Sequence, residues 1–312
     1  MKKTTAVFIA LALCVAVFAL YFIISNISDK DGEGANEDVY LYVDQNDISK
    51  ISSFSFVGGE FDLSFEKNES GAWKYSKNGT LPVNENIIEK MLESTKTVLA
   101  TKIISEDVSQ DELSQYGLDS PSYKLKLSSD HGEKCYLFGD LIKSKGLRYM
   151  MREGSHTVYL AEDTLVESFS NDLTDCLSTD TFPIISEEEI VSFETVCGSF
   201  SLLQSVSENE KLANALSSLS PERAVDFGKE NFSIYGLSES ESILVSITLK
   251  NSKEIKIKFG LGETEEFIYA LVHNDSGVFS EMIYLVTCED FDGLYSHLAA
   301  AAESSAANGE NK

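Results

Sequence analysis

The first hydrophobic feature of the chain is an uncharged apolar run over residues 6–24, which follows Lys2 and Lys3. At 1.5 Å rise per residue, a helix of this length spans roughly the ~30 Å hydrocarbon core of a bilayer. Basic residues precede the run and acidic residues follow it, which predicts a cytoplasmic N-terminus and an extracytoplasmic remainder. We therefore expect a cytoplasmic tip and transmembrane anchor over 1–28, in contact with the lipid bilayer through residues 6–24.

An uncleaved anchor has two alternatives, a cleaved signal peptide and a lipid-modified Cys14. A cleaved signal peptide has a shorter apolar region that ends in small residues, whereas Leu20 to Ile24 are bulky. A lipid-modified Cys14 would need a small residue at Leu13 and no long apolar run after the cysteine. An uncleaved single-pass anchor fits the pattern better than either alternative.

After the apolar run, residues 29–39 are polar, acidic and glycine-containing, which predicts a flexible stalk. Beyond the stalk the same pattern occurs twice, a sign of internal duplication. The paired segments are Tyr116-Gly117-Leu118 with Tyr235-Gly236-Leu237, Phe138-Gly139 with Phe259-Gly260, Tyr149 with Tyr269, and Val158-Tyr159-Leu160 with Ile283-Tyr284-Leu285. This order predicts a first repeat over 40–171, a bridge over 172–184 and a second repeat over 185–298.

Each repeat combines alternating, strand-like runs with one amphipathic helix. In the first repeat, Asn84 is placed to cap a helix whose apolar residues continue at helical spacing to Leu99. In the second, Ser207 and Glu210 have capping-box spacing before a helix that continues to Leu219. Short Gly, Asn, Asp and Ser turns between the strands indicate antiparallel sheets.

The fold class predicted by this pattern is α+β. It consists of an N-terminal transmembrane helix followed by two tandem repeats, each an antiparallel sheet with a covering amphipathic helix. The tail over 299–312 has no aromatic or branched apolar residue, so we expect it to be disordered.

The Tyr-Gly-Leu segment of the first repeat has a local explanation. Ser109 and Glu112 have the spacing of a capping box for a short helix. Gly117 can then take the left-handed conformation that ends a helix, Leu118 can pack back, and Pro121 prevents continuation. This segment is interpreted as a structural stop signal rather than as a ligand contact.

Charge narrows the classes of partner. The chain has 25 Lys and Arg against 51 Asp and Glu, a net charge of −26, and removal of Lys2 and Lys3 leaves −28 for the exported part. Nucleic-acid binding draws on clustered basic residues, so this balance argues against nucleic acid. The acidic residues are dispersed, which favours a solvated surface over a cation site.

The residue types used in catalysis show no recognisable arrangement. Four exported cysteines, Cys135, Cys176, Cys197 and Cys288, form no CxxC pair, so they are free thiols or two disulfides, and free thiols are favoured. The histidines lie in turns or near a helix end and are expected to be peripheral; they are His131, His156, His273 and His297. We expect no catalytic, cofactor-binding or metal-binding residues, no cofactor and no enzymatic activity.

Several short matches to functional motifs are interpreted structurally. Ser64 and Lys67 fit SxxK, but they lie in a strand-like run where positions three apart face opposite sides. The Gly-Leu-Gly over 260–262 is expected to end a strand, and the calcium-loop-like start at Asp29 belongs to the stalk. Trp73 and Tyr75 share a strand face, where a core position is favoured over an exposed binding platform.

The chain resembles a bacterial membrane-anchored family catalogued as domain of unknown function 4340. The residues that carry the resemblance are the N-terminal anchor, Gly71 to Tyr75, Pro82, Tyr116 to Pro121, Phe138-Gly139, Tyr149 and Val158-Tyr159. The second repeat departs from this pattern, since it lacks the tryptophan and the proline after Tyr235-Gly236-Leu237. The resemblance implies no established catalysis, and similar proteins are often associated with gliding-motility-type ABC transporter systems.

Three functions are compatible with these observations. The leading hypothesis is a single-pass, extracytoplasmic accessory or scaffold protein that binds another envelope protein, with an ABC transporter complex as the partner implied by the resemblance. The first alternative is a ligand- or cation-binding module with a cleft between the repeats. The second, less favoured alternative is an envelope hydrolase, for which no local spacing provides support.

Overall fold

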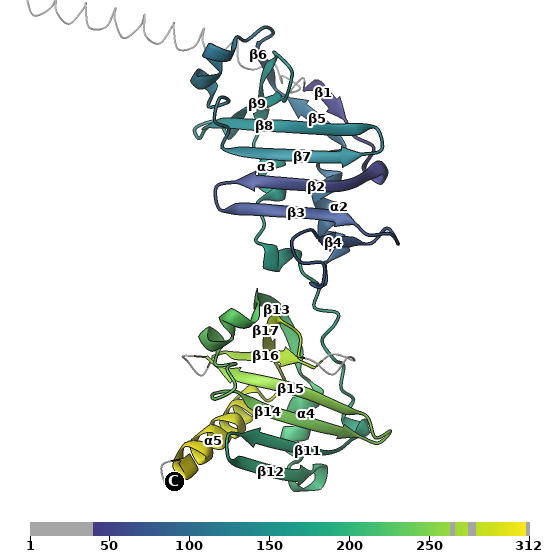
Figure 1. Cartoon of the computed structure of the whole chain (residues 1–312), viewed down its shortest axis with the longest axis vertical. Helices are drawn as coiled ribbons and strands as arrows, with labels where there is room; N and C mark the ends of the chain where they lie inside the picture. Colours follow the sequence, from purple (N-terminus) through teal and green to yellow (C-terminus); the bar gives the residue numbers. More distant parts are fainter. Residues whose placement is uncertain (1–39, 263–265, 274–278, 310–312) are drawn as a thin grey trace, which may run out of the picture.

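The computed structural model describes residues 40–262, 266–273 and 279–309 (Figure 1). The predicted anchor over 1–28 and the predicted stalk over 29–39 lie outside these residues. Within the described ranges, no helix combines the length and apolar character needed to cross a membrane.

The first sheet has eight antiparallel strands in the order β4-β3-β2-β7-β8-β9-β10-β6. Its strands are β2 (Ile51–Gly58), β3 (Phe61–Lys67), β4 (Trp73–Tyr75), β6 (Lys102–Ser105), β7 (Tyr123–Ser129), β8 (Gly132–Ile142), β9 (Leu147–Arg152) and β10 (Val158–Glu162). A separate two-stranded sheet pairs β1 (Leu41–Gln45) with β5 (Thr97–Ala100).

The second sheet has seven antiparallel strands in the order β12-β11-β14-β15-β16-β17-β13. Its strands are β11 (Ile190–Cys197), β12 (Phe200–Ser205), β13 (Ser220–Phe227), β14 (Ile243–Leu249), β15 (Glu254–Leu261), β16 (Ile268–Val272) and β17 (Met282–Thr287). Apart from β4, the two sheets share one strand order, because β3, β2, β7, β8, β9, β10 and β6 occupy the places of β12, β11, β14, β15, β16, β17 and β13.

Helices cover one face of each sheet. They are α2 (Glu85–Glu93), α3 (Thr164–Phe169), α4 (Glu210–Ser217) and α5 (Phe291–Gly309), and Figure 1 shows α2 and α3 behind the first sheet and α4 behind the second. Short 3-10 helices connect the strands: η1 (Ile48–Lys50), η2 (Gln110–Tyr116), η3 (Leu173–Cys176), η4 (Glu187–Glu189), η5 (Val206–Glu208) and η6 (Lys229–Tyr235). The predicted α+β class with antiparallel sheets is confirmed.

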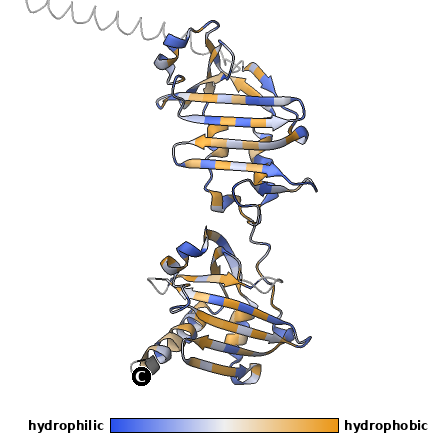
Figure 2. Ribbon diagram, viewed as in Figure 1, coloured by the Kyte–Doolittle hydropathy of each residue, from blue (hydrophilic) through white to orange (hydrophobic). Residues whose placement is uncertain are grey.

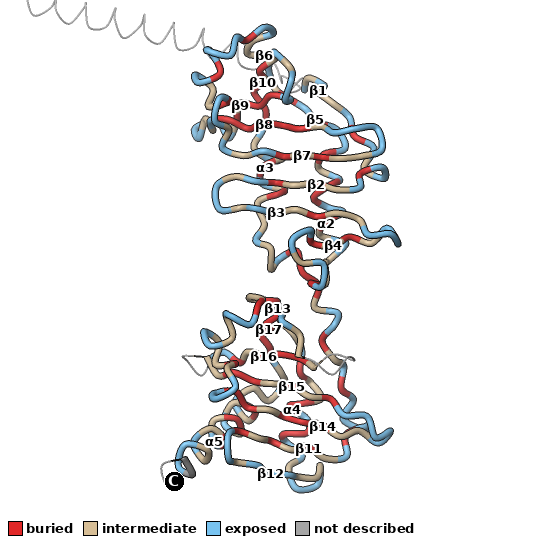
Figure 3. The backbone as a smooth tube through the Cα atoms, in the orientation of Figure 1, coloured by how far each residue is buried: buried red, intermediate tan, exposed pale blue. Residues whose placement is uncertain are grey.

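Alternation along the strands decides which face is buried (Figures 2 and 3). Phe54 and Phe56 of β2 are almost fully buried, and both rings lie within 6 Å of the Phe169 ring of α3. Ser55, between them, points to the opposite face beside Ser64 and Lys126 of the neighbouring strands. The period-2 pattern therefore separates an apolar face under the helices from a polar, open face.

The bridge between the two sheets is packed against both. The Asn84 backbone N–H donates to the Cys176 carbonyl oxygen at 2.9 Å, and Val83 pairs with Leu177. On the other side, the Thr181 hydroxyl lies 2.7 Å from the Tyr284 hydroxyl and the Phe182 ring packs on the Tyr284 ring. Backbone pairing therefore connects the bridge to the first sheet, and side-chain packing connects it to the second.

Both predicted covering helices are shorter than expected. The first ends at Glu93, where the Thr95 hydroxyl donates to the Leu92 carbonyl oxygen, and the following Thr97–Ala100 forms strand β5. Val98 and Ala100 are buried while Leu99 is 40% exposed, so this segment alternates with strand period. The prediction of helix as far as Leu99 was wrong, because this segment pairs with β1 as a strand.

The second covering helix begins at Glu210 and is capped by Asn209, whose side chain accepts the Leu212 N–H. The capping box predicted at Ser207 and Glu210 is therefore wrong. The box forms two residues earlier, between Ser205 and Glu208, and starts η5. Leu219 lies beyond the helix, directly before edge strand β13.

The predicted disordered tail is also wrong over most of its length. α5 continues to Gly309, and its Leu298 and Ala301 side chains are buried. Alanine has the highest helix propensity, so a helix already docked on the sheet can continue through the Ala-rich tail. Residues 310–312 lie outside the described ranges.

A polar network attaches β1 to the first sheet. The fully buried Tyr136 donates its hydroxyl proton to Asp44 Oδ2 at 2.9 Å, and Lys134 Nζ lies 2.7 Å from Asp44 Oδ1. Asn46 Nδ2 donates to the Tyr136 hydroxyl and to the Thr95 carbonyl oxygen. Burial alone would raise the pKa of Asp44, but the hydrogen bonds from Lys134 and Tyr136 outweigh it and lower the pKa below its ordinary 3.8.

Asp44→Asn should reduce the loss of stability in acid. Because the folded-state pKa of Asp44 lies below the unfolded value, its contribution is present above about pH 4 and is lost as the pH falls through the folded pKa. Urea unfolding midpoints between about pH 6 and pH 2 should therefore fall less steeply for Asp44→Asn than for the wild type. Tyr136→Phe keeps the carboxylate and removes one hydrogen-bond donor, so its unfolding midpoint should change with pH by an intermediate amount. The same pH dependence of the midpoint in all three proteins would contradict this role of Asp44.

Candidate functional site

The Tyr-Gly-Leu segment forms the predicted helix stop. Ser109 and Glu112 make a reciprocal capping box at the start of η2, with the Ser109 N–H 3.0 Å from Glu112 Oε2. Gly117 ends η2 with φ 65°, in the left-handed region, and the Leu118 side chain is buried. The interpretation of this segment as a stop signal is confirmed.

The duplicated residues of each sheet meet at one place. A Cβ added to Gly139 would lie 2.0 Å from the Tyr116 carbonyl oxygen, and one added to Gly260 would lie 1.9 Å from the Tyr235 carbonyl oxygen. The Tyr116 and Tyr149 rings lie 5.1 Å apart, and the Tyr235 and Tyr269 rings lie 4.8 Å apart. The Tyr-Gly-Leu and Phe-Gly segments recur together because the end of a 3-10 helix crosses directly over a glycine of the sheet.

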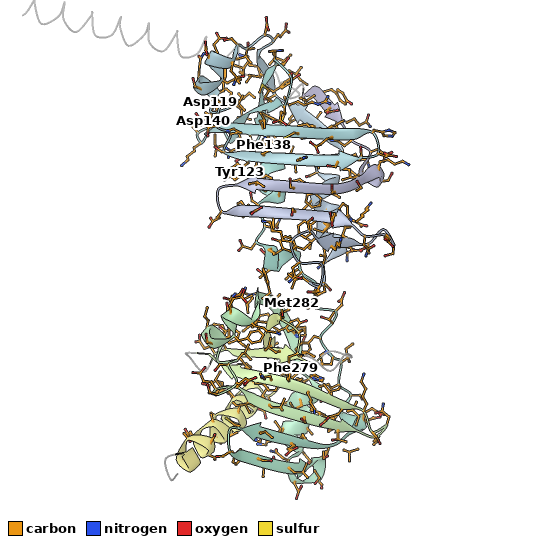
Figure 4. The ribbon with its side chains drawn as sticks, viewed as in Figure 1. Asp119, Tyr123, Phe138, Asp140, Phe279 and Met282 are labelled. Carbon is orange, nitrogen blue, oxygen red and sulfur yellow. The ribbon has the colours of Figure 1, made fainter. Side chains whose placement is uncertain are left out.

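In the first sheet, a cavity lies on the open face next to this crossing. The segment around η2 covers a small apolar cluster there that includes Leu118, Leu137 and Met151. A cavity of about 600 Å³ lies beside it, with Leu137 and Met151 among its apolar lining residues. Its polar lining includes Asp119, Lys124, Glu153 and His156. We call this space the η2 cavity; Figure 4 shows the labelled Asp119 at the same end of the sheet as Asp140.

An ion pair lies at the edge of the η2 cavity. Lys124 Nζ is 3.0 Å from Glu153 Oε1, and both side chains are about half exposed. Their hydrogen bond raises the pKa of Lys124 and lowers the pKa of Glu153, so both groups are charged at neutral pH. Exposed pairs of this kind add little stability.

A buried thiol, Cys135, and an imidazole, His156, lie close to the η2 cavity. Burial, with a smaller effect of Glu153, raises the pKa of Cys135 to about 11, so the thiol stays protonated at neutral pH. His156 Nδ1 lies 3.4 Å from the Val108 carbonyl oxygen, beneath the start of η2. Protonated thiols are poor nucleophiles, so Cys135 lacks the activation that a catalytic cysteine needs.

The second sheet lacks the charged pair. Strand register places Leu244 at the position of Lys124, since Leu244 pairs with Lys258 as Lys124 pairs with Leu137. The same register places His273 at the position of Glu153, and the His273 ring packs on the Phe279 ring. Leu237, Leu271 and Ile283 are fully buried under η6. The two sheets therefore share a packing unit but differ in surface chemistry.

The remaining sequence-level candidates lie apart from the η2 cavity. Ser64 and Lys67 lie in strand β3, as predicted. Trp73 and Tyr75 are both buried, which confirms their core position. Within the described ranges no cluster of three or more His, Cys, Asp and Glu residues could hold a metal ion, and Cys135, Cys176, Cys197 and Cys288 are free.

One histidine is less peripheral than expected. His297 lies in the middle of α5 and is half-buried, and its Nε2 is 3.0 Å from the hydroxyl oxygen of the buried Thr195. Burial lowers the pKa of His297, so the ring is neutral at pH 7. The sequence placed this residue near a helix end because the expected helix stopped at residue 298.

Lys124 and Glu153 were not singled out from the sequence. The alternating YKLKL run does place Lys124 on the open face, but Glu153 lies in a hairpin turn 29 residues away. Only the antiparallel order of β7, β8 and β9 brings the two charges together. The available signal was a lysine on the open face of a strand that follows the duplicated Tyr-Gly-Leu segment.

Residues 73–209 match the sequence model of the family described as Domain of unknown function (DUF4340). This part of the chain is similar to that family. The DUF4340 match begins in β4 and ends at the cap of α4, so it includes the η2 cavity and the first two strands of the second sheet. No curated protein and no solved structure matches the chain significantly.

Proposed function

We propose that this protein is a membrane-anchored, extracytoplasmic accessory protein that binds another envelope protein and has no catalytic activity of its own. In this proposal residues 6–24 span the membrane with the N-terminus in the cytoplasm. The two sheets form tandem repeats outside the cytoplasm. The family resemblance suggests a component of an ABC transporter complex as the class of partner.

The observation that carries the binding role is the η2 cavity. An apolar floor of Leu137 and Met151 lies beside the half-exposed Lys124–Glu153 pair. A polypeptide segment with one apolar side chain and flanking polar groups suits such a site, because its apolar group can be desolvated while both charges remain paired. Protonated Cys135 and hydrogen-bonded His156 support binding over covalent chemistry at this position.

A matched ion pair outside the cavity gives a control for this proposal. Lys126 Nζ lies 2.7 Å from Glu133 Oε2, and both side chains are about half exposed. Lys126 lies two residues after Lys124 on β7, so the two lysines share one face of that strand. Neither residue lines the η2 cavity. Substitutions at the two pairs change the net charge equally, so only the position relative to the cavity differs.

Lys124→Glu should weaken partner binding about fivefold, because it places a second negative charge beside Glu153. The full-length protein, with a photoreactive phenylalanine derivative at the exposed, cavity-lining Gln110, would be irradiated in intact cells. We expect one crosslinked product of reproducible mass, with a reduced yield in Lys124→Glu. The exchange Lys124→Glu with Glu153→Lys should recover part of the yield because the pair is restored.

Lys126→Glu is the control and should leave the yield unchanged. Thermal unfolding of each variant would confirm that the fold is retained, as expected for exposed pairs. Absence of a crosslinked product from position 110, or an equal loss in Lys126→Glu, would contradict a partner site in the η2 cavity.

A further inference from the structure

Open sheets leave strands at their edges with unpaired backbone groups. Natural proteins protect such edges with short strands, charged residues, proline or β-bulges, since an unprotected edge pairs with another strand. The first sheet ends at β4 and β6, and the second ends at β13 and β12. These four edges differ sharply in protection.

Three of the four edges are protected. β4 has three residues and includes Lys74. β6 has four residues, begins at Lys102, and its register with β10 is shifted. β13 carries Pro221, three charged residues and two register shifts against β17.

The fourth edge, β12, has none of these features. Its sequence FSLLQS has no charge and no proline, and its six residues pair with β11 without a register shift. Leu203 is 69% exposed and Leu202 is 38% exposed. Among the described residues, no further backbone hydrogen bond involves Ser201 or Leu203. β12 forms the lower edge of the second sheet in Figure 1.

Hairpin geometry shows which backbone groups face outward. β11 and β12 are joined by a two-residue turn, Gly198-Ser199, with Gly198 at φ 52°. In such a hairpin the closing pair, Cys197 with Phe200, is hydrogen-bonded and the bonded pairs then alternate. The backbone N–H and C=O groups of Ser201 and Leu203 therefore point away from β11.

Charge indicates what can occupy this edge. With a net charge of −26, two copies of the chain repel each other over most of their surface. β12 is an uncharged strand that two acidic copies can share. An antiparallel strand pair also has two-fold symmetry, so one strand can pair with its own copy without any complementary surface elsewhere.

We propose that this protein forms a homodimer in which β12 pairs antiparallel with β12 of a second copy. The pairing is centred on Leu203, so that the two Leu203 residues lie opposite each other across the two-fold axis. In this register, Ser201 of one copy lies opposite Ser205 of the other. This register uses the outward backbone groups of Leu203 and covers the most exposed leucine of the edge. The surface is separate from the η2 cavity, so the dimer and the partner site are independent.

A cysteine on a two-fold axis forms a disulfide with its own copy. Cα atoms of directly paired antiparallel residues lie ~4.5–5.5 Å apart, within the range that a disulfide bridges. Full-length Leu203→Cys, co-expressed in two differently tagged forms, would be oxidised in isolated membranes. We expect a product of twice the chain mass that carries both tags.

Two controls define the register. Residue 202 lies on the same strand but faces the other side of the sheet, and the two residues at position 202 are not directly opposite each other. Leu202→Cys should therefore give at least about fivefold less crosslinked dimer than Leu203→Cys. The wild type, with its native cysteines, gives the background. A mixed product with a different polypeptide, or no product from Leu203→Cys, would overturn the homodimer.

A second variant tests the same edge without oxidation. Leu203→Lys adds the charge that protected edges carry and places two lysines opposite each other, which should weaken association at least about tenfold. Sedimentation of the purified full-length protein at several concentrations would measure this change, with thermal unfolding to confirm the fold. A wild type that sediments as a monomer at all concentrations, or unchanged association in a folded Leu203→Lys, would refute the proposal.

Discussion

Replacing Gly139 with alanine should lower the free energy of unfolding by about 3 kcal/mol. The new Cβ would lie 2.0 Å from the Tyr116 carbonyl oxygen and 3.1 Å from the Gly117 carbonyl carbon. Both atoms belong to backbone, so no side-chain rotation can relieve the clash, and the end of η2 must move off the sheet. Movement of η2 would also uncover Leu118 and open the η2 cavity.

Gly79→Ala is the matched control. Gly79 has only the flexible Lys74 side chain nearby, 3.5 Å from the position of an added Cβ. Such a substitution should change stability by no more than about 0.5 kcal/mol, since ordinary contacts replace a clash. Urea unfolding of both variants at pH 7 measures the difference, and similar stabilities would show that the crossing over Gly139 can relax.

Replacing Asp163 with alanine should lower the free energy of unfolding by about 3 kcal/mol, because it leaves the buried guanidinium of Arg148 without its counter-charge. Arg148 Nε and Nη2 bind the two Asp163 carboxylate oxygens at 2.5 and 3.1 Å, and the two side chains are 8% and 14% exposed. Arg148 also donates to the Gly139 carbonyl oxygen at 2.7 Å and lies over the Tyr123 ring. Loss of the carboxylate would therefore disturb the glycine crossing as well.

A second pair and a double variant separate charge from packing. Asp62→Ala removes the partner of Lys77 from a pair in which both side chains are more than half exposed. It should lower the free energy of unfolding by less than about 0.5 kcal/mol.

The double variant Arg148→Ile with Asp163→Val should recover part of the lost stability, because the buried Ile268 occupies the position of Arg148 in the second sheet. If Asp163→Ala unfolds at the same urea concentration as Asp62→Ala, the buried pair does not support the fold.

Local sequence signals predicted the parts of this fold that depend on neighbours in the chain. The capping box at Ser109 and the left-handed Gly117 depend on four to eight consecutive residues, and both formed as expected. Strand alternation likewise placed Trp73 and Tyr75 in the core. These features are decided by backbone conformation and by the period-2 geometry of a strand.

Sequence patterns failed where two structures were compatible with one pattern. Helical spacing of apolar residues continues to Leu99, but pairing with β1 makes Thr97–Ala100 a strand. The Ala-rich end of the chain was read as disordered, but the docking of Leu298 and Ala301 on the second sheet holds α5 in place. In both cases a distant segment supplied the contacts that decided between helix, strand and coil.

The candidate site depends still more on distant contacts. Lys124 and Glu153 become neighbours only through the pairing of three strands. The η2 cavity is likewise lined by residues from distant parts of the chain, among them Leu118, Leu137 and Met151. The unprotected edge at β12 became visible only once the strand order showed which strands end each sheet.

The sequence by itself determined the duplicated α+β plan, the strongly acidic charge and the local stop signals, because these follow from composition and from short-range periodicity. It also indicated the family whose sequence model matches residues 73–209. Only the tertiary structure decided the ends of the helices, the buried Arg148–Asp163 pair, the η2 cavity and the open edge. Each of these depends on contacts between residues far apart in the chain, which local patterns do not encode.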